Sequence, residues 1–228
     1  ASATGSATAA ASSAASASAV DSVVPDETAG PYPGDGSNGR NVLDDSGVVR
    51  SDITTSIGSS EKVAGVPMTI NLTVTDSTSG YAAMAGAAVY VWHCDAAGNY
   101  SMYSQGATDQ TWLRGVTETN ANGTATFTSV FPGCYAGRWP HIHFEVYKST
   151  SDATSSGQIV KTSQIALPQA ICETVYQNTS TYPNSTRNLG QLSLKTDNVF
   201  GNDGGIHQLA TVTGDASSGY VVNLTIGV

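Results

Sequence analysis

Charged side chains are scarce in this sequence, and their scarcity excludes several classes of protein. Only 12% of the 228 residues are charged, with nine basic against 18 acidic residues, a net charge of −9 and a pI of about 4.6. Without a basic cluster, the chain lacks the electrostatic footprint of a nucleic-acid-binding protein. Long amphipathic helices are also excluded, because they need many Glu, Lys, Arg and Leu residues.

Long hydrophobic runs and paired cysteines are missing as well. No apolar stretch approaches the roughly 20 residues of a membrane-spanning helix, so no membrane partner is expected. The three cysteines, Cys94, Cys134 and Cys172, contain no CxxC pair that would indicate a zinc or redox site. They allow either buried free thiols or one disulfide, and export of the protein would favour a Cys134–Cys172 bridge with Cys94 free.

The N-terminal composition indicates where the folded domain begins. Residues 1–19 are almost entirely Ala, Ser, Thr and Gly, and a flexible tail or linker is predicted because little there could be buried. One domain is expected over residues 20–228, a length that a single all-β domain can reach. The chain starts at Ala1 without a signal segment, which fits either a processed secreted protein or a trimmed chain. We therefore expect an extracellular protein, and its oligomeric state stays open.

The sequence contains short β-rich segments separated by turn residues. They predict an all-β fold, a β-sandwich of mainly antiparallel strands with long loops and at most short helices. Residues 27–39 are rich in Gly and Pro and predict an extended arm, and residues 168–176 allow a short helix. Strands are expected at residues 68–75, 87–94, 124–131, 141–147, 159–167, 206–212 and 220–226.

The sequence His141-Ile142-His143 provides a candidate metal site. Alternate residues of a strand point to the same face about 6.6 Å apart, so both imidazoles could bind one ion. Such a pair could equally be two exposed histidines, or a zinc or copper site. The alternation places Glu145 and Tyr147 on the same face as the histidines, and it places three residues in the core: Ile142, Phe144 and Val146.

Tyrosine and arginine side chains lie close to this pair in sequence. Residues 131–140 (FPGCYAGRWP) form a bend that brings Tyr135 and Arg138 beside the first histidine. A cation is unfavourable beside a metal unless the site holds an anion, so Arg138 indicates an anionic substrate or intermediate; alternatively it packs and binds backbone carbonyls. In VYVWHCDAAGNYSMYS (89–104), Tyr100 emerges after a turn, although Tyr100 or Tyr103 could be a core residue.

Taken together, these motifs resemble the intradiol ring-cleavage dioxygenases, the catechol and protocatechuate 3,4-dioxygenase group, and particularly their compact secreted relatives. The resemblance covers roughly residues 27–176. It rests on GPYP (30–33), VVRSDI (48–53), the 89–104 segment, the run from WLRG to HFEVY (112–147) and, more weakly, SQIALP (163–168).

This resemblance implies an activity and a ligand set. The activity is cleavage of a catechol-type ring by O2 between the two hydroxyl-bearing carbons, giving cis,cis-muconate-type diacids, so the expected partners are a small aromatic diol and O2. Arg138 matches the active-site arginine, Gln164 a glutamine that assists it, and Tyr32 a residue bordering the substrate pocket. Tyr135 would also act as a base. The implied ligands of one Fe(III) are Tyr100, Tyr135, His141 and His143.

The residue types suit such a metal. Fe(III) is a hard cation that prefers oxygen donors to thiolates, and coordination stabilises a phenolate although the pKa of free tyrosine is about 10. Zinc or copper would fit two tyrosines poorly. A different alternative is a non-catalytic secreted β-sandwich binding module with a vestigial metal site. Two departures from the larger enzymes, a short segment of five residues between Tyr135 and His141 and no N-terminal helical region, leave substrate and oligomeric state open.

Overall fold

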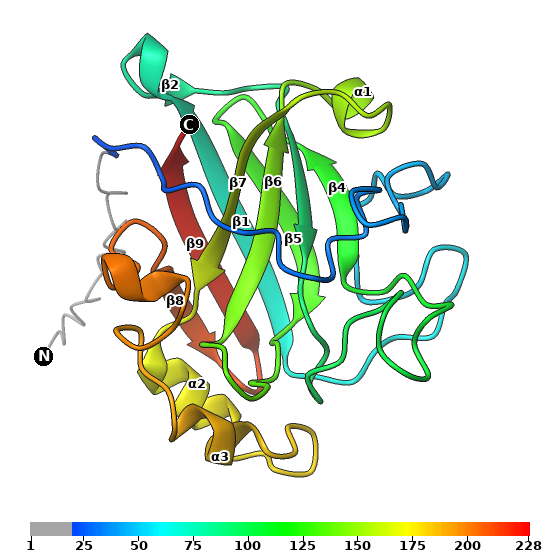
Figure 1. Ribbon diagram of the computed structural model, residues 1–228, viewed down its shortest axis with the longest axis vertical. Coiled ribbons are helices and arrows are strands. Elements are labelled where there is room, and N and C mark those ends of the chain that lie inside the picture. Colours follow the sequence, from blue (N-terminus) through cyan, green and yellow to red (C-terminus); the bar gives the residue numbers. More distant parts are fainter. Residues whose placement is uncertain (1–19) are drawn as a thin grey trace, which may run out of the picture.

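The computed structural model describes residues 20–228, which form two β-sheets packed face to face (Figure 1). One sheet contains β5 (Thr124–Val130), β1 (Pro67–Asp76), β9 (Gly219–Gly227) and β8 (Thr211–Asp215), with β2 (Ala82–Ala83) also paired to β1. The other has the order β4 (Arg114–Glu118), β3 (Ala88–Trp92), β6 (His141–Tyr147) and β7 (Ile159–Ala166). Among these strands β1 and β9 pair in parallel and the other pairs are antiparallel. The predicted all-β sandwich is confirmed.

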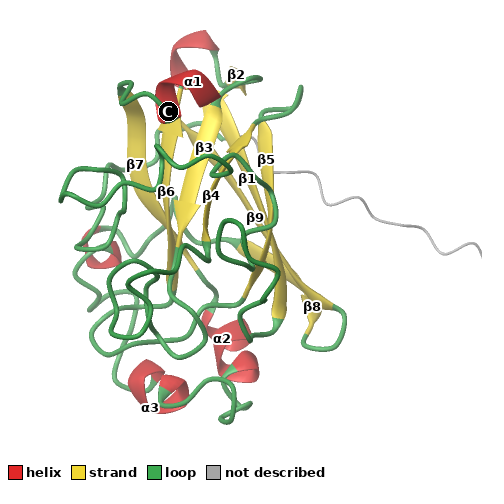
Figure 2. Cartoon of the chain, turned by 90° about the vertical axis from the view of Figure 1, so that its right-hand side faces the viewer, coloured by secondary structure: helices red, strands yellow, loops and turns green. Residues whose placement is uncertain are grey.

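Helices are few and short. The predicted helix near residue 170 is α2 (Gln169–Val175), which lies with α3 (Ser185–Leu189) at one end of the sandwich (Figure 2). The helix α1 (Thr150–Ala153) lies at the opposite end, and 3₁₀ turns occupy Ser77–Ser79 and Phe200–Asn202. None of the helices within residues 20–228 is long and apolar enough to cross a membrane.

The alternation predicted for β6 is confirmed. Ile142, Phe144 and Val146 are completely buried in the core between the sheets. His141 is the first residue of the strand, so the histidine pair lies at the end of the sandwich where α2 and α3 are found (Figure 1). Because neighbouring strands hold β6 on both sides, the two histidines start from a rigid backbone.

Both faces of the four-stranded sheet are buried, which explains why all seven residues of β6 are buried. The face turned away from the other sheet carries a second cluster that includes Tyr90, Trp92 and Tyr147. Residues 27–39, for which an extended arm was predicted, belong to an N-terminal segment that crosses this sheet (Figure 1): the Glu27 amide donates to the Thr162 carbonyl, and the Tyr90 hydroxyl donates to the Pro33 carbonyl. The arm therefore forms a cover next to the histidine pair.

One predicted strand is wrong, and one observed strand was not predicted. The strand expected at 206–212 is wrong over most of its length, because residues 206–208 form turns and β8 begins at Thr211. Ile206, which made this segment look like a strand, is 71% exposed. The sequence also missed β4, whose residues RGVTE show no apolar alternation; it forms because Gly115 leaves room for close packing, where a Cβ would lie 2.6 Å from Ile53. The tail predicted for residues 1–19 lies outside the described residues.

The predicted Cys134–Cys172 disulfide is wrong, because all three cysteines are free and buried. The thiols face backbone carbonyls: Cys94 Sγ lies 3.4 Å from the Gly133 oxygen, and Cys134 Sγ lies 3.7 Å from the Arg138 oxygen. Burial raises the pKa of each thiol, to about 12 for Cys134. These cysteines therefore act as small apolar side chains of low reactivity.

We predict that the native protein reacts slowly with a thiol reagent and that all three cysteines react once it is unfolded without a reductant. Burial and the raised thiol pKa both suppress the reactive thiolate in the native state. Colorimetric thiol titration would measure the count, with a reduced and unfolded sample as the control. Finding one thiol before reduction and three after it would restore the disulfide.

Candidate metal centre

Two loops and one strand carry the four predicted ligands, and glycine allows them to meet. Tyr100 follows the turn after β3, and Tyr135 lies in the bend between β5 and β6. A Cβ on Gly133 would lie 2.4 Å from the Ala96 carbonyl oxygen, so a larger residue would push the bend away from the turn. The Gly133 amide instead donates to the Asp95 carbonyl at 2.9 Å. The two tyrosine-bearing loops are therefore joined directly through their backbones.

The polar atoms of the four predicted ligands converge at the start of β6. Nε2 of His141 lies 3.1 Å from Nε2 of His143 and 3.2 Å from the Tyr135 hydroxyl oxygen. It lies 3.4 Å from the Tyr100 oxygen, and the two tyrosine oxygens are 3.2 Å apart. Both histidines and Tyr100 are almost completely buried. The fold thus places two oxygens and two nitrogens around one point.

The histidine rings are neutral and are held in place from outside this point. Nδ1 of His141 contacts the Trp139 carbonyl, so it carries the ring proton and leaves a lone pair on Nε2. The ring of His143 stacks on Trp92 with centroids 4.9 Å apart, and its Nδ1 is buried without a partner within the described residues. Burial lowers the pKa of His141 to about 3 and that of His143 well below its ordinary value. Neutral imidazoles are the form that binds metals.

The spacing of these four atoms fits a single hard metal ion. Bonds of about 2.0–2.1 Å place neighbouring ligand atoms about 2.9 Å apart at right angles and about 3.3 Å apart at the tetrahedral angle. The observed separations of 3.1–3.4 Å are close to this range. Within residues 20–228, His, Cys, Asp and Glu alone form no group of three that could hold a metal, so a metal at this point would have to use the tyrosines as ligands. A set of two phenol oxygens and two imidazoles suits Fe(III).

Without a cation, the two tyrosines would remain protonated. Burial raises the pKa of Tyr100 well above its ordinary value and that of Tyr135 to about 12. The guanidinium of Arg114 offsets a small part of this rise for Tyr100, and that of Arg138 does so for Tyr135. Conversion of both side chains to phenolates at neutral pH therefore requires a strongly charged ion beside their oxygens.

The other two histidines lie outside this cluster. His93 is buried, and each of its ring nitrogens has its own partner, the Cys94 carbonyl and the Ser129 hydroxyl, both at 2.7 Å. Burial lowers its pKa to about 4. His207 is exposed and contacts Ser22. Neither histidine presents a free nitrogen to the metal centre.

Arg138 reaches the cluster and is held by side chains on two sides. Its Nε donates to Asp197 at 3.0 Å, and Nη2 donates to Gln164 at 2.7 Å. Nη1 lies 3.4 Å from Nε2 of His141. Within the described residues Arg138 donates to no backbone carbonyl, which was the alternative role considered for it. The structure thus brings the predicted pair of Arg138 and Gln164 together, with one guanidinium nitrogen turned toward the cluster.

A pocket of about 690 Å³ adjoins the cluster. Tyr32, predicted to border it, lines the pocket, is 38% exposed and packs against Tyr100 with ring centroids 5.0 Å apart. Thr28, Asn198 and Val199 add uncharged wall. Among the described residues that line the pocket, Arg138 alone carries a full charge. The site therefore combines the cluster of four candidate metal ligands with a mostly uncharged cavity.

The sequence did not indicate Asp197, although this residue anchors Arg138. Its carboxylate is completely buried and also accepts hydrogen bonds from the backbone amides of Trp139 and Val199, at 2.7 and 2.9 Å. Burial acts to raise its pKa, but these hydrogen bonds and Arg138 outweigh burial and hold the pKa below its usual value. Asp197 is thus ionised at neutral pH. A single Asp in a polar loop gives no sequence signal that could have identified it.

Arg114 was also missed. It is 1% exposed and has no carboxylate partner among the described residues. Its guanidinium donates to the carbonyls of Pro33 and Tyr32 at 2.8 Å and of Ser101 at 2.9 Å. Arg114 therefore fastens the arm that carries Tyr32 to the loop that carries Tyr100. An arginine among apolar residues in WLRGV was the signal that could have found it.

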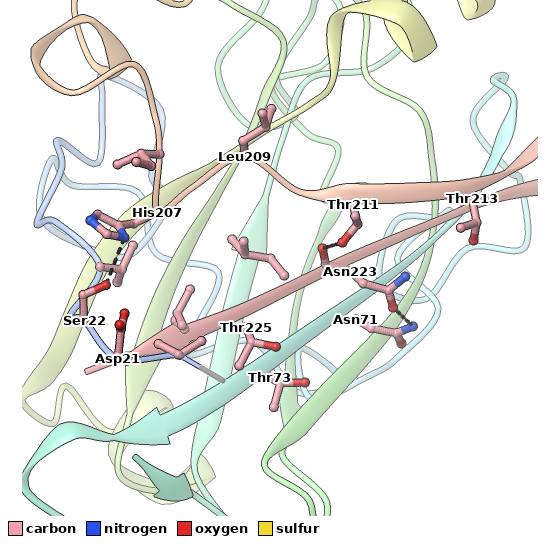
Figure 3. A pocket seen from close by; sticks show the side chains of 16 residues that line it. Asp21, Ser22, Asn71, Thr73, His207, Leu209, Thr211, Thr213, Asn223 and Thr225 are labelled. Atoms are coloured by element: carbon pink, nitrogen blue, oxygen red, sulfur yellow. Dashed lines mark hydrogen bonds between the residues drawn. The ribbon is translucent and has the colours of Figure 1, made fainter. Parts of the chain in front are cut away.

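A second hollow of about 640 Å³ lies on the outer face of the other sheet (Figure 3). It is lined by uncharged Thr and Asn side chains from β1, β8 and β9 together with Leu224 and Ile226, and Asn71 donates to Asn223 at 3.0 Å. Ser22 and His207 meet in its lining. None of the predicted site residues lines this hollow, so it is separate from the metal centre.

Comparisons with solved structures find the same fold in intradiol dioxygenases. An intradiol ring-cleavage dioxygenase from Tetranychus urticae is 24% identical, with a TM-score of 0.68 over 90% of this chain and 94% of that one. The dioxygenase domain of a carbohydrate-binding fusion protein from Streptomyces sp. SirexAA-E is 22% identical, with a TM-score of 0.55 over 91% and 98%. Hydroxyquinol 1,2-dioxygenase from Pseudomonas putida DLL-E4 is 14% identical, with a TM-score of 0.53 over 92% of this chain and 68% of that one.

The family assignment comes from the sequence comparison. No curated protein matches the chain. A family model described as Dioxygenase matches residues 46–179, more than half of the 228 residues. The match spans all four residues of the cluster together with Arg138 and Gln164. This match shows that the chain belongs to the dioxygenase family, and solved intradiol dioxygenases share its fold.

Proposed function

We propose that this protein is an Fe(III)-dependent enzyme that cleaves the ring of catechol-type compounds with O2 between the two hydroxyl-bearing carbons, giving cis,cis-muconate-type diacids. The observation that carries the proposal is the convergence of two tyrosine oxygens and two histidine nitrogens, each within 3.4 Å of another. Family membership supports the same reaction class.

The four converging side chains would hold the iron, and each tyrosine has a distinct place. Iron held there would supply the positive charge that favours binding of the catechol oxygens and activation of the ring toward O2. Two phenolates would offset two of its three positive charges. Tyr135 is more exposed than Tyr100, and both line the pocket. We assign acceptance of a substrate proton to the Tyr135 oxygen and a permanent ligand role to the buried Tyr100.

Arg138 has the position of a charge-stabilising donor. Its Nη1 faces the cluster, while Nε and Nη2 are occupied by Asp197 and Gln164. A donor held in this way needs no rearrangement when negative charge develops on the substrate ring, and this preorganisation is the basis of electrostatic catalysis. Gln164 is itself fixed, because its Nε2 donates to the Thr28 carbonyl at 2.9 Å.

The pocket favours uncharged catechols larger than catechol itself. Its volume of about 690 Å³ falls in the range of pockets that hold drug-sized ligands. Among the described lining residues there is no free cation for a carboxylate, since the guanidinium of Arg138 is paired with Asp197. Tyr32 and Val199 provide apolar surface for a ring substituent.

We predict one Fe(III) per chain and a red to burgundy colour from tyrosinate-to-iron charge transfer. Tyr135→Phe should remove part of the visible band, because one of the two phenolates is lost. Tyr103→Phe is the matched control and should keep iron and colour, because the Tyr103 hydroxyl bonds to Asn38 rather than to the cluster. Elemental analysis and visible spectra measure both. Full occupancy by zinc or copper without a visible band would contradict the assignment.

Arg138→Ala should leave iron content and colour intact and lower turnover per iron about 100-fold, which corresponds to about 3 kcal/mol of lost transition-state stabilisation. The exposed Arg187 on α3 supplies the control, Arg187→Ala, with unchanged turnover. Activity must be normalised to bound iron. Wild-type turnover per iron combined with a lower melting temperature would make Arg138 a packing residue instead.

Oxygen uptake by the iron-loaded protein tests the reaction itself. The panel should contain catechol, hydroxyquinol, protocatechuate and uncharged catechols with alkyl or aryl substituents. We expect uptake with ring-opened diacids identified by mass spectrometry, and the highest kcat/KM for the substituted uncharged compounds. Iron-loaded protein that consumes no oxygen with any member of the panel would favour the non-catalytic binding module.

A further inference from the structure

Asp197 is a buried group to which the proposed reaction gives no role of its own. Its carboxylate accepts two hydrogen bonds from the guanidinium of Arg138, from Nε at 3.0 Å and from Nη2 at 3.4 Å. It also accepts from Trp139, in the bend that carries Tyr135, and from Val199, in the pocket wall. One carboxylate therefore connects the arginine, the bend and the wall.

Arg138 is the only cationic residue among the described residues that line the pocket. Its ion pair with Asp197 offsets this charge. The arginine side chain is 14% exposed and the aspartate side chain is completely buried, so water screens the pair only weakly. Glu27 interacts electrostatically with both residues, and burial raises the pKa of its carboxyl group. A ligand entering the pocket therefore meets no net positive charge.

This charge balance bears directly on the choice of substrate. A carboxylate taken into a partly buried site loses hydration, and it needs a cation there to offset that loss. In this pocket the cation already has a buried anionic partner. An uncharged substituent loses little by entering and can contact Tyr32 and Val199.

We infer that Asp197 determines specificity: by neutralising and orienting Arg138, it makes the pocket select uncharged catechols over carboxylate-bearing ones. Asp197 lines no part of the pocket itself and acts through Arg138, so it is a positioning residue. The identity of the ring substrate rests on the proposed function, whereas the selection against carboxylates rests on the charges alone.

Asp197→Asn removes the charge and keeps the shape and an acceptor oxygen for the Trp139 amide. The ratio of kcat/KM for protocatechuate to that for 4-methylcatechol should rise at least about tenfold, mainly through a lower KM for protocatechuate, since charges a few ångströms apart in a partly buried site interact strongly. Iron content and the visible band should stay unchanged.

Asp76→Asn is the matched control. Asp76 caps the 3₁₀ turn Ser77–Ser79 by accepting from the Thr78 amide, as Asp197 accepts from Val199 near the other 3₁₀ turn. This control removes the same charge at the end of the sandwich opposite the pocket, so the ratio should not change. In an Arg138→Met background, Asp197→Asn should also leave the ratio unchanged, because no cation is released.

Benzoate binding to the metal-free protein tests the charge selection without catalysis. Calorimetry should detect no binding to the wild type or to Arg138→Met/Asp197→Asn, and clear binding to Asp197→Asn. If Asp197→Asn does not fold, benzoate binding by the wild type still decides, because tight binding would overturn the inference. Benzoate binding only to Asp197→Asn, in a protein that cleaves no catechol, would refute the proposed function and keep the inference. Catechol cleavage with an unchanged ratio and no benzoate binding in the variant would overturn the inference.

Discussion

Two tyrosine oxygens and two histidine nitrogens each lie within 3.4 Å of another inside the protein: the hydroxyls of Tyr100 and Tyr135 and Nε2 of His141 and His143. The rest of the site depends on this close approach. Buried polar atoms need partners, and here the partners are largely one another. A cation at their centre would replace this mutual contact by four bonds to the metal, so binding and local stability are coupled. The short approach between Gly133 and Ala96 is the backbone feature that makes the convergence possible.

Buried charges hold the loops that carry the tyrosines. Arg114 fixes the arm and the Tyr100 loop through backbone carbonyls, and Asp197 fixes the Tyr135 bend through a backbone amide. A buried charge is costly unless hydrogen bonds replace its hydration, and each of these two groups has at least four. Irregular loops thereby gain the positional precision that metal ligands require.

Local patterns in the sequence predicted the strands whose residues alternate between apolar and polar, but not the strands that form through contacts with their neighbours. The alternation in HIHFEVY gave β6 its correct bounds and its core face, whereas RGVTE, which forms β4 through its neighbours, gave no such signal. Periodicity cannot predict which residues from loops far apart in sequence meet in space. The ligand set came from motif resemblance, and Asp197 was missed because its partner Arg138 lies 59 positions away. The disulfide prediction was wrong because cysteine spacing carries no information on where each thiol points.

The division between a rigid strand and variable loops also separates reaction type from substrate choice. His141 and His143 extend from a strand whose alternate residues, Ile142, Phe144 and Val146, are locked in the core, so the geometry of the histidine pair is tied to the stability of the whole sandwich. The pocket walls come from the arm and from loops, which can change without disturbing that core. Asp197, with Asn198 and Val199, lies beyond the family match at residues 46–179. The charge that the pocket presents can therefore change without a change in the four clustered side chains.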